Sequence, residues 1–380
     1  PTTLTNRTPV LISEIKQKTN QFYSEQKQYT PFSISRMPVA FISHFEKSHD
    51  KITRIKRCIK CVLPSTFPFI EYDKEGICNY CNNHKPFVNK GKDVLAKEFD
   101  KLKSKTIGDY DCLIPLSGGR DSCYTLHYVS QELGLKPLAF SYDWGMITDL
   151  ARRNQSRLCG KLGIEHILIS ADIRKKRKNI RKNVNAWLKN PHMGMVPIFM
   201  AGDKQYHYFS NLLSTQNKLN LSVMGENPFE ITNFKSGFCG IRPKYGSLKY
   251  ISILDKIRML LLYGKEYLVN PAYFNQSILD TIDAFNSYYV IKHKNINIFD
   301  YLPWNEETII GTLEPYEWEI ADDTKSTWRI GDGTASFYNY IYYVIAGFDE
   351  NDTFRSNQIR EGQISRSEAN ELLISDHLPR

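Results

Sequence analysis

The chain has 380 residues, 41% of them hydrophobic and 24% charged, an ordinary globular composition that is long enough for one large or two modest domains. The net charge is +9, and seven basic residues lie between 174 and 182. This charge is compatible with an acidic partner, but it does not tell whether that partner is RNA or a phosphorylated small molecule. Residues 1–20 lack the apolar segment of a secretory signal, and the longest uncharged stretch near the C-terminus, 334–348, is too short to cross a bilayer, so we expect a cytoplasmic protein.

Residues 1–50 form an extension to which the sequence assigns no role. They carry many polar residues, scattered aromatic residues and several prolines, without a sustained hydrophobic period. Such a pattern favours no regular element.

The next segment, 51–90, is predicted to be a zinc-binding module. It holds two Cys-x-x-Cys pairs, which are Cys58 with Cys61 and Cys78 with Cys81. Each pair can place two thiolates on one tight turn, and four sulfur atoms complete a tetrahedral shell around zinc. Residues 69–77 predict a strand, a turn and a strand that return the second pair to the first. Disulfides are the alternative, which a reducing cytoplasm disfavours.

The segment 91–240 alternates between short apolar runs and amphipathic stretches. The expected strands are 111–116, 137–142, 164–170 and 221–225, and the expected helices are 90–105, 121–133 and 148–162. Right-handed crossovers between them give a parallel, doubly wound α/β sheet of the Rossmann-like kind, whose ligand lies beyond the carboxyl ends of the strands. The remaining residues, 241–380, are expected to form a mostly helical region that binds a substrate or a partner, with helical spacing at 251–263 and 337–348.

The loop between the first strand and the first helix carries the chemistry. Its sequence is Ser117-Gly-Gly-Arg-Asp-Ser122. Adjacent glycines let several backbone amides converge on one anion at the positive end of the following helix, which makes a phosphate cradle. The loop lacks the Lys of Walker-type ATPases and resembles instead the PP-loop signature of ATP pyrophosphatases. An ordinary strand-to-helix turn is the alternative.

In the PP-loop superfamily this loop holds the pyrophosphate part of ATP while the substrate attacks the α-phosphate. The resemblance implies that four residues hold the leaving pyrophosphate: Ser117, Gly118, Gly119 and Ser122. Asp121 would be the catalytic ligand of the magnesium ion, because its carboxylate is a hard oxygen donor. Arg120 occupies a variable position and would either assist ATP binding or point to solvent.

Two further strand ends are expected on the same rim of the sheet. Ser141 and Asp143 end the second strand and should lie beside the adenosine, where Asp143 could contact ribose or metal. Glu226 and Asn227 follow the later strand and are candidates for the substrate or ammonia side of the site. A polar turn without function is the alternative for this second pair.

Six short blocks together resemble the N-acetyl sugar amidotransferases, which act in surface polysaccharide and lipopolysaccharide biosynthesis. The blocks are Cys58–Cys61 with the following Pro64, Gly76–Cys81, the loop Ser117–Ser122, Gly225–Asn227, Trp328–Gly333 and Phe354–Gly362. The resemblance implies that the acetamido group of a nucleotide-linked sugar becomes an acetamidino group, with ATP and ammonia as the other substrates. Adenylylation of the amide oxygen would let ammonia displace AMP, so that AMP and pyrophosphate are released.

This resemblance also points to residues for the sugar. Arg329 and Asp332 are the first candidates for gripping the sugar or its nucleotide, and Lys325 and Arg355 are weaker ones. The basic residues from Arg174 to Lys182 could meet the phosphates of the nucleotide, and a solvated helix face is the alternative for them.

The source of ammonia is expected to be another protein. A glutaminase of the triad type needs Cys in a Gly-x-Cys-x-Gly turn, and the sequence around Cys239 lacks the final Gly, so we interpret Cys239 as structural. The family resemblance implies a partner glutaminase similar to that of imidazole glycerol phosphate synthase, with a cyclase-like companion as a further candidate. Nucleic acid and membrane are not expected partners.

Two other functions stay open at this stage. A tRNA-thiolating enzyme agrees with the positive charge and the zinc module, but such enzymes generally use an additional catalytic cysteine pair. No such pair is evident among the remaining cysteines, which are Cys112, Cys123, Cys159 and Cys239. A non-catalytic assembly subunit is the other alternative, and the intact loop with Asp121 disfavours it.

Overall fold

The computed structural model describes residues 39–103, 108–243, 252–290, 295–322, 324 and 326–378. Most of the expected N-terminal extension, residues 1–38, lies outside the described residues, as does Lys325. The end of that extension belongs to helix α2 (Val39–Thr53), which packs against α13 (Ala335–Ala346). Its Phe41 ring lies 5.2 Å from the ring of Tyr340.

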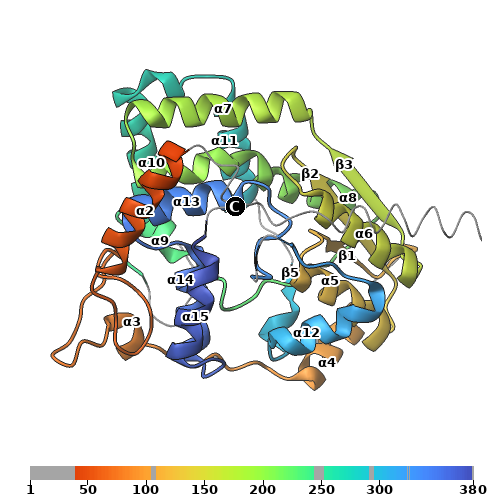
Figure 1. Cartoon of the computed structure of the whole chain (residues 1–380). Helices are drawn as coiled ribbons and strands as arrows, with labels where there is room; N and C mark the ends of the chain where they lie inside the picture. Colours follow the sequence, from red (N-terminus) through yellow and green to blue (C-terminus); the bar gives the residue numbers. More distant parts are fainter. Residues whose placement is uncertain are drawn as a thin grey trace, which may run out of the picture.

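The described part of the chain contains a five-stranded parallel sheet, which lies toward the right in Figure 1. Its strands are β1 (Cys112–Pro115), β2 (Pro137–Asp143), β3 (His166–Ser170), β4 (Ser222–Met224) and β5 (Asn295–Asn297). The strand order is β3-β2-β1-β4-β5, and every neighbouring pair is parallel. The doubly wound α/β class and the four strands expected from the sequence are therefore confirmed. The order turns back between β1 and β4, which is where such sheets bind ligands.

Strand β5 was not expected, because its residues Asn295–Asn297 are short and polar and lie in a region predicted to be mostly helical. It pairs with β4 from Ser222↔Asn295 to Met224↔Asn297. The sheet thus continues past residue 240, where the sequence places a boundary between domains. That boundary stays a prediction.

Helices cover both faces of the sheet, because successive strand residues point to opposite sides. On one face, Ile114 packs with residues of α4 (Lys92–Lys103), α5 (Arg120–His127) and α6 (Asp149–Leu162). On the other face, Leu113 packs with Leu213 of α8 (Tyr206–Gln216). The parallel sheet is therefore buried on both sides, as the crossover connections require.

The ends of α6 show why this helix starts and stops where the sequence predicts. The Thr148 side chain accepts a hydrogen bond of 3.2 Å from Ala151 N, which caps the helix start. Gly163 ends the helix in the left-handed conformation, with φ of 65°. Helix α5 begins at Arg120, directly after the loop residue Gly119 in the N-cap position, and continues into a π-helical turn, Tyr128–Glu132.

The described residues beyond 240 are largely helical, as expected. Their α-helices besides α13 are α10 (Ile253–Val269), α11 (Ser277–Phe285), α12 (Glu306–Leu313), α14 (Glu350–Arg360) and α15 (Arg366–Asp376), with 3₁₀ turns at Pro271–Tyr273, Ile298–Asp300 and Glu314–Tyr316. Earlier in the chain lie α3 (Asn79–Asn82), α7 (Ile173–Lys189), α9 (Asn233–Gly237) and a 3₁₀ segment at Met193–Gln205. A second π-helical turn spans Asn286–Val290. No helix in the described residues combines the length and the apolar character needed to span a membrane.

A second core joins the cysteine module to the C-terminal helices. The ring of Phe67, between the two cysteine pairs, lies 4.9 Å from the ring of Phe348, which follows α13. Val62 donates a backbone hydrogen bond of 3.3 Å to Ser356 Oγ in α14. The cysteine module therefore shares one hydrophobic core with the C-terminal helices.

Candidate functional site

The loop between β1 and α5 closes on itself through its two serines. Ser117 Oγ and Ser122 Oγ lie 2.9 Å apart, and Ser117 N donates to Ser122 Oγ at 3.1 Å. Ser122 Oγ in turn donates to Gly119 O at 3.1 Å, while Gly119 N donates to Ser117 Oγ at 3.3 Å. The hydroxyls hold the loop in one shape at the positive end of α5, an arrangement suited to an anion.

Gly118 gives the loop its turn. Its φ is 81°, a conformation that favours glycine. Two donors fix its carbonyl oxygen, because Nδ2 of the buried Asn154 and Nε1 of the half-buried Trp318 each lie 3.2 Å from Gly118 O. Trp318 was not among the sequence candidates, since it lies 200 residues beyond the loop.

Arg120 lies inside the protein, with only 2% of its surface exposed, so the solvent-facing alternative is wrong. Its guanidinium contacts Glu230 and lies 3.1 Å from Glu306 and 4.8 Å from the centre of the Trp304 ring. Although burial disfavours its charge, the carboxylates of Asp121, Glu230 and Glu306 raise the pKa of Arg120. Arg120 is thus permanently charged, and its guanidinium holds these three carboxylates close together.

Asp121 sits at the centre of this group. Its Oδ1 accepts hydrogen bonds from Trp304 Nε1 at 2.7 Å and from Arg120 Nε at 3.3 Å. Burial raises the pKa of Asp121, although Arg120 and Trp304 act in the opposite direction. Both bonds go to the same oxygen, so within the described residues Oδ2 remains available, and Asp121 fits the expected magnesium ligand.

The loop after β4 packs directly against the start of α5. A Cβ on Gly225 would lie 2.6 Å from Asp121 O, so only glycine allows this approach. Glu226 N donates to Asn297 Oδ1 at 2.7 Å, and Asn227 Nδ2 donates to a Glu230 oxygen at 3.4 Å. The structure thereby brings Glu226 and Asn227 to the rim where the sequence placed them.

Glu230 is a site residue that the sequence did not indicate. Burial raises its pKa to about 8, although Arg120 lowers it. Glu230 follows Asn227 by three residues without forming a recognisable motif. The two residues between Asn227 and Glu230, Pro and Phe, do not mark Glu230 as a site residue among the other acidic residues of the chain.

Ser141 and Asp143 lie at the expected end of β2, but their side chains are engaged within the protein. Ser141 Oγ donates to Leu116 O at 2.5 Å and lies 2.8 Å from His166 Nε2. Asp143 accepts hydrogen bonds from Arg152 Nη2 at 2.7 Å and from Gly145 N at 2.8 Å. A contact of either side chain with adenosine therefore stays a prediction.

The turn at 328–333 reaches the loop from the C-terminal region. A Cβ on Gly331 would lie 3.2 Å from Ser117 O, so the two backbones are in close contact. Thr148 ties the turn to α6, because its Oγ1 donates to Ile330 O at 2.8 Å. Arg329 has φ of 56°, which is strained for a residue with a side chain and common at functional sites.

Arg329 is paired with a buried carboxylate. Its Nε lies 3.2 Å from a Glu350 oxygen, and Lys235 Nζ lies 2.5 Å from the other oxygen. Tyr338 OH donates to Glu350 at 3.0 Å. Burial alone would raise the pKa of Glu350, but Arg329 and Lys235 lower it to about 2. Lys235 and Glu350 were missed, because no local pattern marks them.

The other sugar candidates face inward. Asp332 Oδ1 accepts hydrogen bonds from Thr334 N at 2.8 Å and Thr334 Oγ1 at 2.6 Å, and burial raises the pKa of Asp332. Arg355 is 3% exposed, and its Nε lies 3.1 Å from Asp376 Oδ2. Both residues support the local structure. A role in binding sugar stays a prediction for Asp332 and for Arg355.

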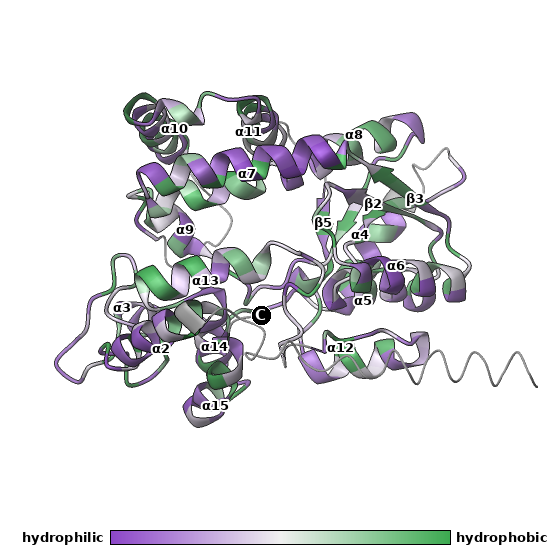
Figure 2. Cartoon of the chain, turned by 45° about the horizontal axis from the view of Figure 1, so that its top comes forward, coloured by the Kyte–Doolittle hydropathy of each residue, from purple (hydrophilic) through white to green (hydrophobic). Residues whose placement is uncertain are grey.

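The basic cluster lies on α7, which is mostly hydrophilic in Figure 2. Lys176 is an exception, because it is buried and its Nζ lies 2.6 Å from Asp280 Oδ1. Arg177 Nε donates to Gly145 O at 2.8 Å, which ties α7 to the loop after β2. Arg174, Lys175, Lys178 and Arg181 are exposed.

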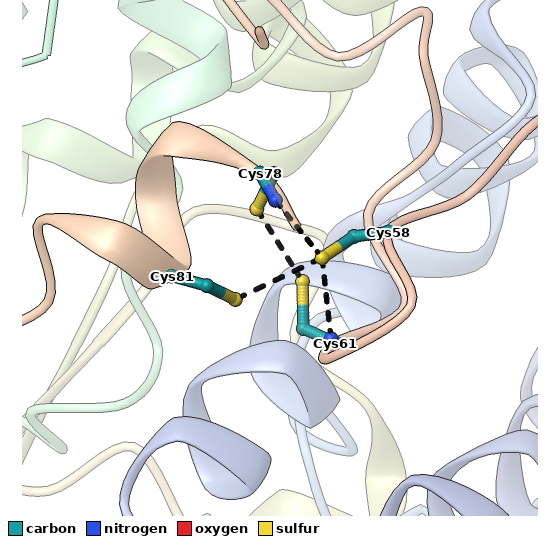
Figure 3. Close-up of side chains that lie close together, drawn as sticks. All are labelled: Cys58, Cys61, Cys78 and Cys81. Atoms are coloured by element: carbon teal, nitrogen blue, oxygen red, sulfur yellow. Dashed lines mark hydrogen bonds between the residues drawn. The ribbon is translucent and has the colours of Figure 1, made fainter. Parts of the chain in front are cut away.

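The four cysteines of the predicted zinc module converge (Figure 3). Cys58 Sγ lies 4.0 Å from Cys81 Sγ, and Cys61 Sγ lies 3.8 Å from Cys78 Sγ. Four thiolates bound tetrahedrally at the usual Zn–S length lie about 3.8 Å apart, so the cluster fits a zinc ion and not two disulfides. The expected hairpin is reduced to a turn with one bridge, Tyr72↔Cys78.

The other cysteines are buried and separate from this cluster. Burial raises the pKa of Cys159 and of Cys239 to about 12, and it also raises the pKa of Cys112 and Cys123. Neutral thiols in such surroundings are poor nucleophiles.

No protein-family model matches the sequence, and no curated protein matches it. Among solved structures, NMN synthetase from Francisella tularensis is similar with 12% identity and a TM-score of 0.33, covering 71% of this chain and 93% of that one. The NH3-dependent NAD synthetase from Campylobacter jejuni has 12% identity and a TM-score of 0.27, covering 53% and 96%. NAD+ synthetase from Burkholderia pseudomallei has 11% identity and a TM-score of 0.25, covering 59% and 84%. At these values the likeness carries no conclusion about activity.

Proposed function

We propose that this protein is an ATP-dependent carbon-nitrogen ligase of the PP-loop kind, which converts the acetamido group of a nucleotide-linked sugar to an acetamidino group. The observation that carries the proposal is the loop from Ser117 to Ser122. Its serine hydroxyls, its left-handed Gly118 and the start of α5 form an anion cradle at the carboxyl end of β1. Pyrophosphate is the anion that the signature implies.

The groups around the loop support ATP chemistry. Asp121 would hold the magnesium ion that offsets the charge of the leaving pyrophosphate, with its Oδ1 fixed by Trp304. Arg120 would position Asp121 and the carboxylates Glu230 and Glu306 rather than contact ATP itself. The metal supplies electrostatic stabilisation when bound, and these side chains set where it binds.

The reaction would proceed in two steps. An amide carbonyl is a poor electrophile, and its oxygen is a very poor leaving group. Transfer of AMP to that oxygen, with release of pyrophosphate, makes an imidate from which AMP departs when ammonia attacks. Glu230 shares its partner Arg120 with Asp121, and because burial raises its pKa to about 8 it would exchange a proton with the nitrogen.

Thiolation of tRNA is less well supported. That chemistry needs a reactive thiolate, and the four cysteines outside the cluster are buried with raised pKa values. The same argument makes Cys239 a poor glutaminase nucleophile. We therefore also propose that ammonia comes from a partner glutaminase. We further propose that the protein works in the cytoplasm, since four converging thiols that suit a metal fit a reducing compartment.

The test is a reaction with ATP, magnesium and ammonium, using a panel of nucleotide-linked diacetamido sugars. The proposal predicts AMP and pyrophosphate in equal amounts, together with a sugar in which NH replaces one oxygen. Release of ADP would contradict the proposed reaction. So would a failure to form AMP with every sugar of the panel.

A further inference from the structure

Helix α10 turns an apolar face away from the protein. Its outward side chains are aliphatic, each is between 45% and 77% exposed, and they are Ile253, Leu254, Ile257, Leu260, Leu261 and Leu268. At 3.6 residues per turn they occupy an arc of about 120° along the helix. Apolar side chains scattered singly are normal on protein surfaces, whereas a continuous apolar face marks a site of interaction.

The charged side chains of α10 that reach the surface are basic. Arg258 and Lys265 are exposed next to one edge of the apolar arc, whereas the two acidic residues of the helix, Asp255 and Glu266, are buried. Arg258 lies 3.4 Å from Asp255, and its side chain is still 65% exposed. The helix therefore presents aliphatic side chains bordered by positive charge.

Exposed apolar residues extend from α10 to the end of α7. Asn270, which follows α10, donates a hydrogen bond of 2.6 Å from its Nδ2 to Ala186 O near the end of α7. This contact brings the exposed Leu268 and Val269 close to the last residues of α7, among which Leu188 is exposed. The apolar surface is therefore not confined to one helix.

Helix α7 adds positive charge to the same region. Its exposed basic residues include Arg174, Lys175, Lys178 and Arg181. The helix packs against α11 and against the 3₁₀ turn Pro271–Tyr273, which follows α10. Figure 2 shows α7 as a mostly hydrophilic helix beside α10 and α11. An apolar face and a basic helix thus lie next to each other.

A second copy of the chain is a poor occupant for this face. Two-fold, antiparallel pairing of α10 with itself would bring Arg258 of one copy near Lys265 of the other. Both acidic residues of α10, a helix that the structure describes completely, are buried. No exposed carboxylate of α10 therefore offsets this repulsion.

A protein partner also fits less well than lipid. The cores of protein interfaces are enriched in Tyr, Trp and Arg, and such interfaces carry direct hydrogen bonds. The arc on α10 offers only Leu, Ile and Gly264, which has no side chain. Hydrocarbon needs no hydrogen bond, and Lys or Arg at the edge of a helix that lies in the plane of a membrane can reach the lipid phosphates.

We propose that α10 binds the surface of a membrane that contains anionic lipid, with its aliphatic face among the acyl chains and the basic residues of α7 and α10 at the headgroups. The helix lies in the plane of the surface, because its opposite face, with the buried Met259 and Glu266, stays packed on the protein.

This inference differs from the expectation that no membrane is bound. That expectation rested on the lack of a segment long enough to cross a bilayer, and a helix that lies on the surface needs no such length. The inference goes beyond the proposed function and does not depend on it, because binding to lipid can be measured without ATP.

The experiment is sedimentation of the whole protein with vesicles of phosphatidylcholine, with and without phosphatidylglycerol, at low and at high salt. Binding should require phosphatidylglycerol and should weaken as salt rises, because salt screens the basic residues. Leu261→Gln should weaken binding about tenfold, since one leucine no longer enters the acyl chains. The matched control Ile374→Gln changes an exposed aliphatic residue of α15 and should leave binding unchanged.

The basic helix is tested separately. Lys178→Gln combined with Arg181→Gln removes two charges from α7 and should weaken binding about tenfold at low salt. Lys92→Gln combined with Lys97→Gln removes two charges from the exposed side of α4 and should have a much smaller effect. Circular dichroism establishes that each variant is folded.

The outcomes decide between the occupants. Vesicle binding that weakens in the Leu261→Gln variant and in the α7 variant supports the inference, whether or not the protein forms AMP. Failure of the whole protein to bind vesicles with phosphatidylglycerol overturns it, as does binding that folded Leu261→Gln protein retains in full. A dimer in solution that Leu261→Gln dissociates also overturns it, because the face then belongs to a second copy.

Discussion

Gly118 lies so close to Ala151 that a Cβ on Gly118 would come within 2.3 Å of the Ala151 carbonyl oxygen. The loop is therefore pressed against the first turn of α6, and its shape depends on the absence of a side chain there. The neighbouring Gly119 differs, because its Cβ would meet only Ser117 Oγ, at 3.4 Å.

Replacing Gly118 by Ala should damage both stability and ATP turnover. The left-handed conformation alone costs about 1–2 kcal/mol for a residue with a side chain, and the contact with Ala151 adds to this. Gly119→Ala, with an ordinary φ of −76°, is the matched control and should change the free energy of unfolding by less than about 1 kcal/mol. Urea unfolding measures both. Equal stability of the two variants would contradict the described loop.

Asp121→Asn should abolish pyrophosphate release while the fold is kept. Asn keeps an oxygen for the Trp304 hydrogen bond, but it lacks the charge that binds magnesium. Circular dichroism tests whether the fold is kept, and a pyrophosphate assay tests turnover. Asp100→Asn on the exposed side of α4 is the control and should change neither the spectrum nor the rate of pyrophosphate release. A folded Asp121→Asn enzyme with normal pyrophosphate release would remove the magnesium role from Asp121.

The sequence predicts the sheet well because apolar runs and helix caps are local signals. Thr148 and Gly163 mark the two ends of α6, and the structure has both caps. Strand β5 was missed because Asn295–Asn297 has no apolar run of its own and depends on pairing with β4.

The site is predictable where its residues form one motif or directly follow an expected strand, as Glu226 and Asn227 do. The loop residues Ser117 and Asp121 share one motif, whereas Glu230, Glu306 and Trp304 reach Arg120 only in the folded chain. Their role follows from burial and charge pairing, which a single sequence does not encode locally.

Removing zinc should unfold the cysteine module. We expect one zinc ion per chain, and Cys78→Ser should lose it and lower the melting temperature, since metal binding there is folding energy. Cys239→Ser, outside the cluster, should keep its zinc. Elemental analysis and thermal melting measure these effects. A native protein without zinc, or with Cys58 and Cys61 oxidised, would refute the assignment.

Glu350 should make stability depend on pH in the acidic range. Its pKa is about 2 in the folded protein, below its ordinary value, so its contribution is complete above about pH 5 and is lost as the pH falls toward 2. Glu350→Gln leaves Lys235 and Arg329 without their carboxylate and should cost about 3 kcal/mol or more at pH 7.

The measurement is the difference in free energy of unfolding between wild type and Glu350→Gln from pH 7 to pH 3. That difference should shrink as the pH falls. The exposed Glu371→Gln should show a small difference at every pH. A gap for Glu350→Gln that stays constant down to pH 3 would show that Glu350 is not held as a buried anion.

The supply of nitrogen provides the last test of the proposed reaction. The isolated protein should turn over with high ammonium and fail with glutamine, because Cys239 is a buried, protonated thiol. Ammonia and not ammonium is the nucleophile, so at fixed total ammonium the rate should rise with pH toward the pKa of ammonium. When the partner glutaminase is added, glutamine should support turnover with a weaker dependence on pH, since ammonia is then made and delivered inside the complex. Cys239→Ser should preserve both activities, and Arg329→Ala should impair both, because it removes a partner of the buried Glu350 in the turn that packs against the loop. Glutamine use by the isolated chain that disappears in Cys239→Ser would show that the protein carries its own glutaminase site.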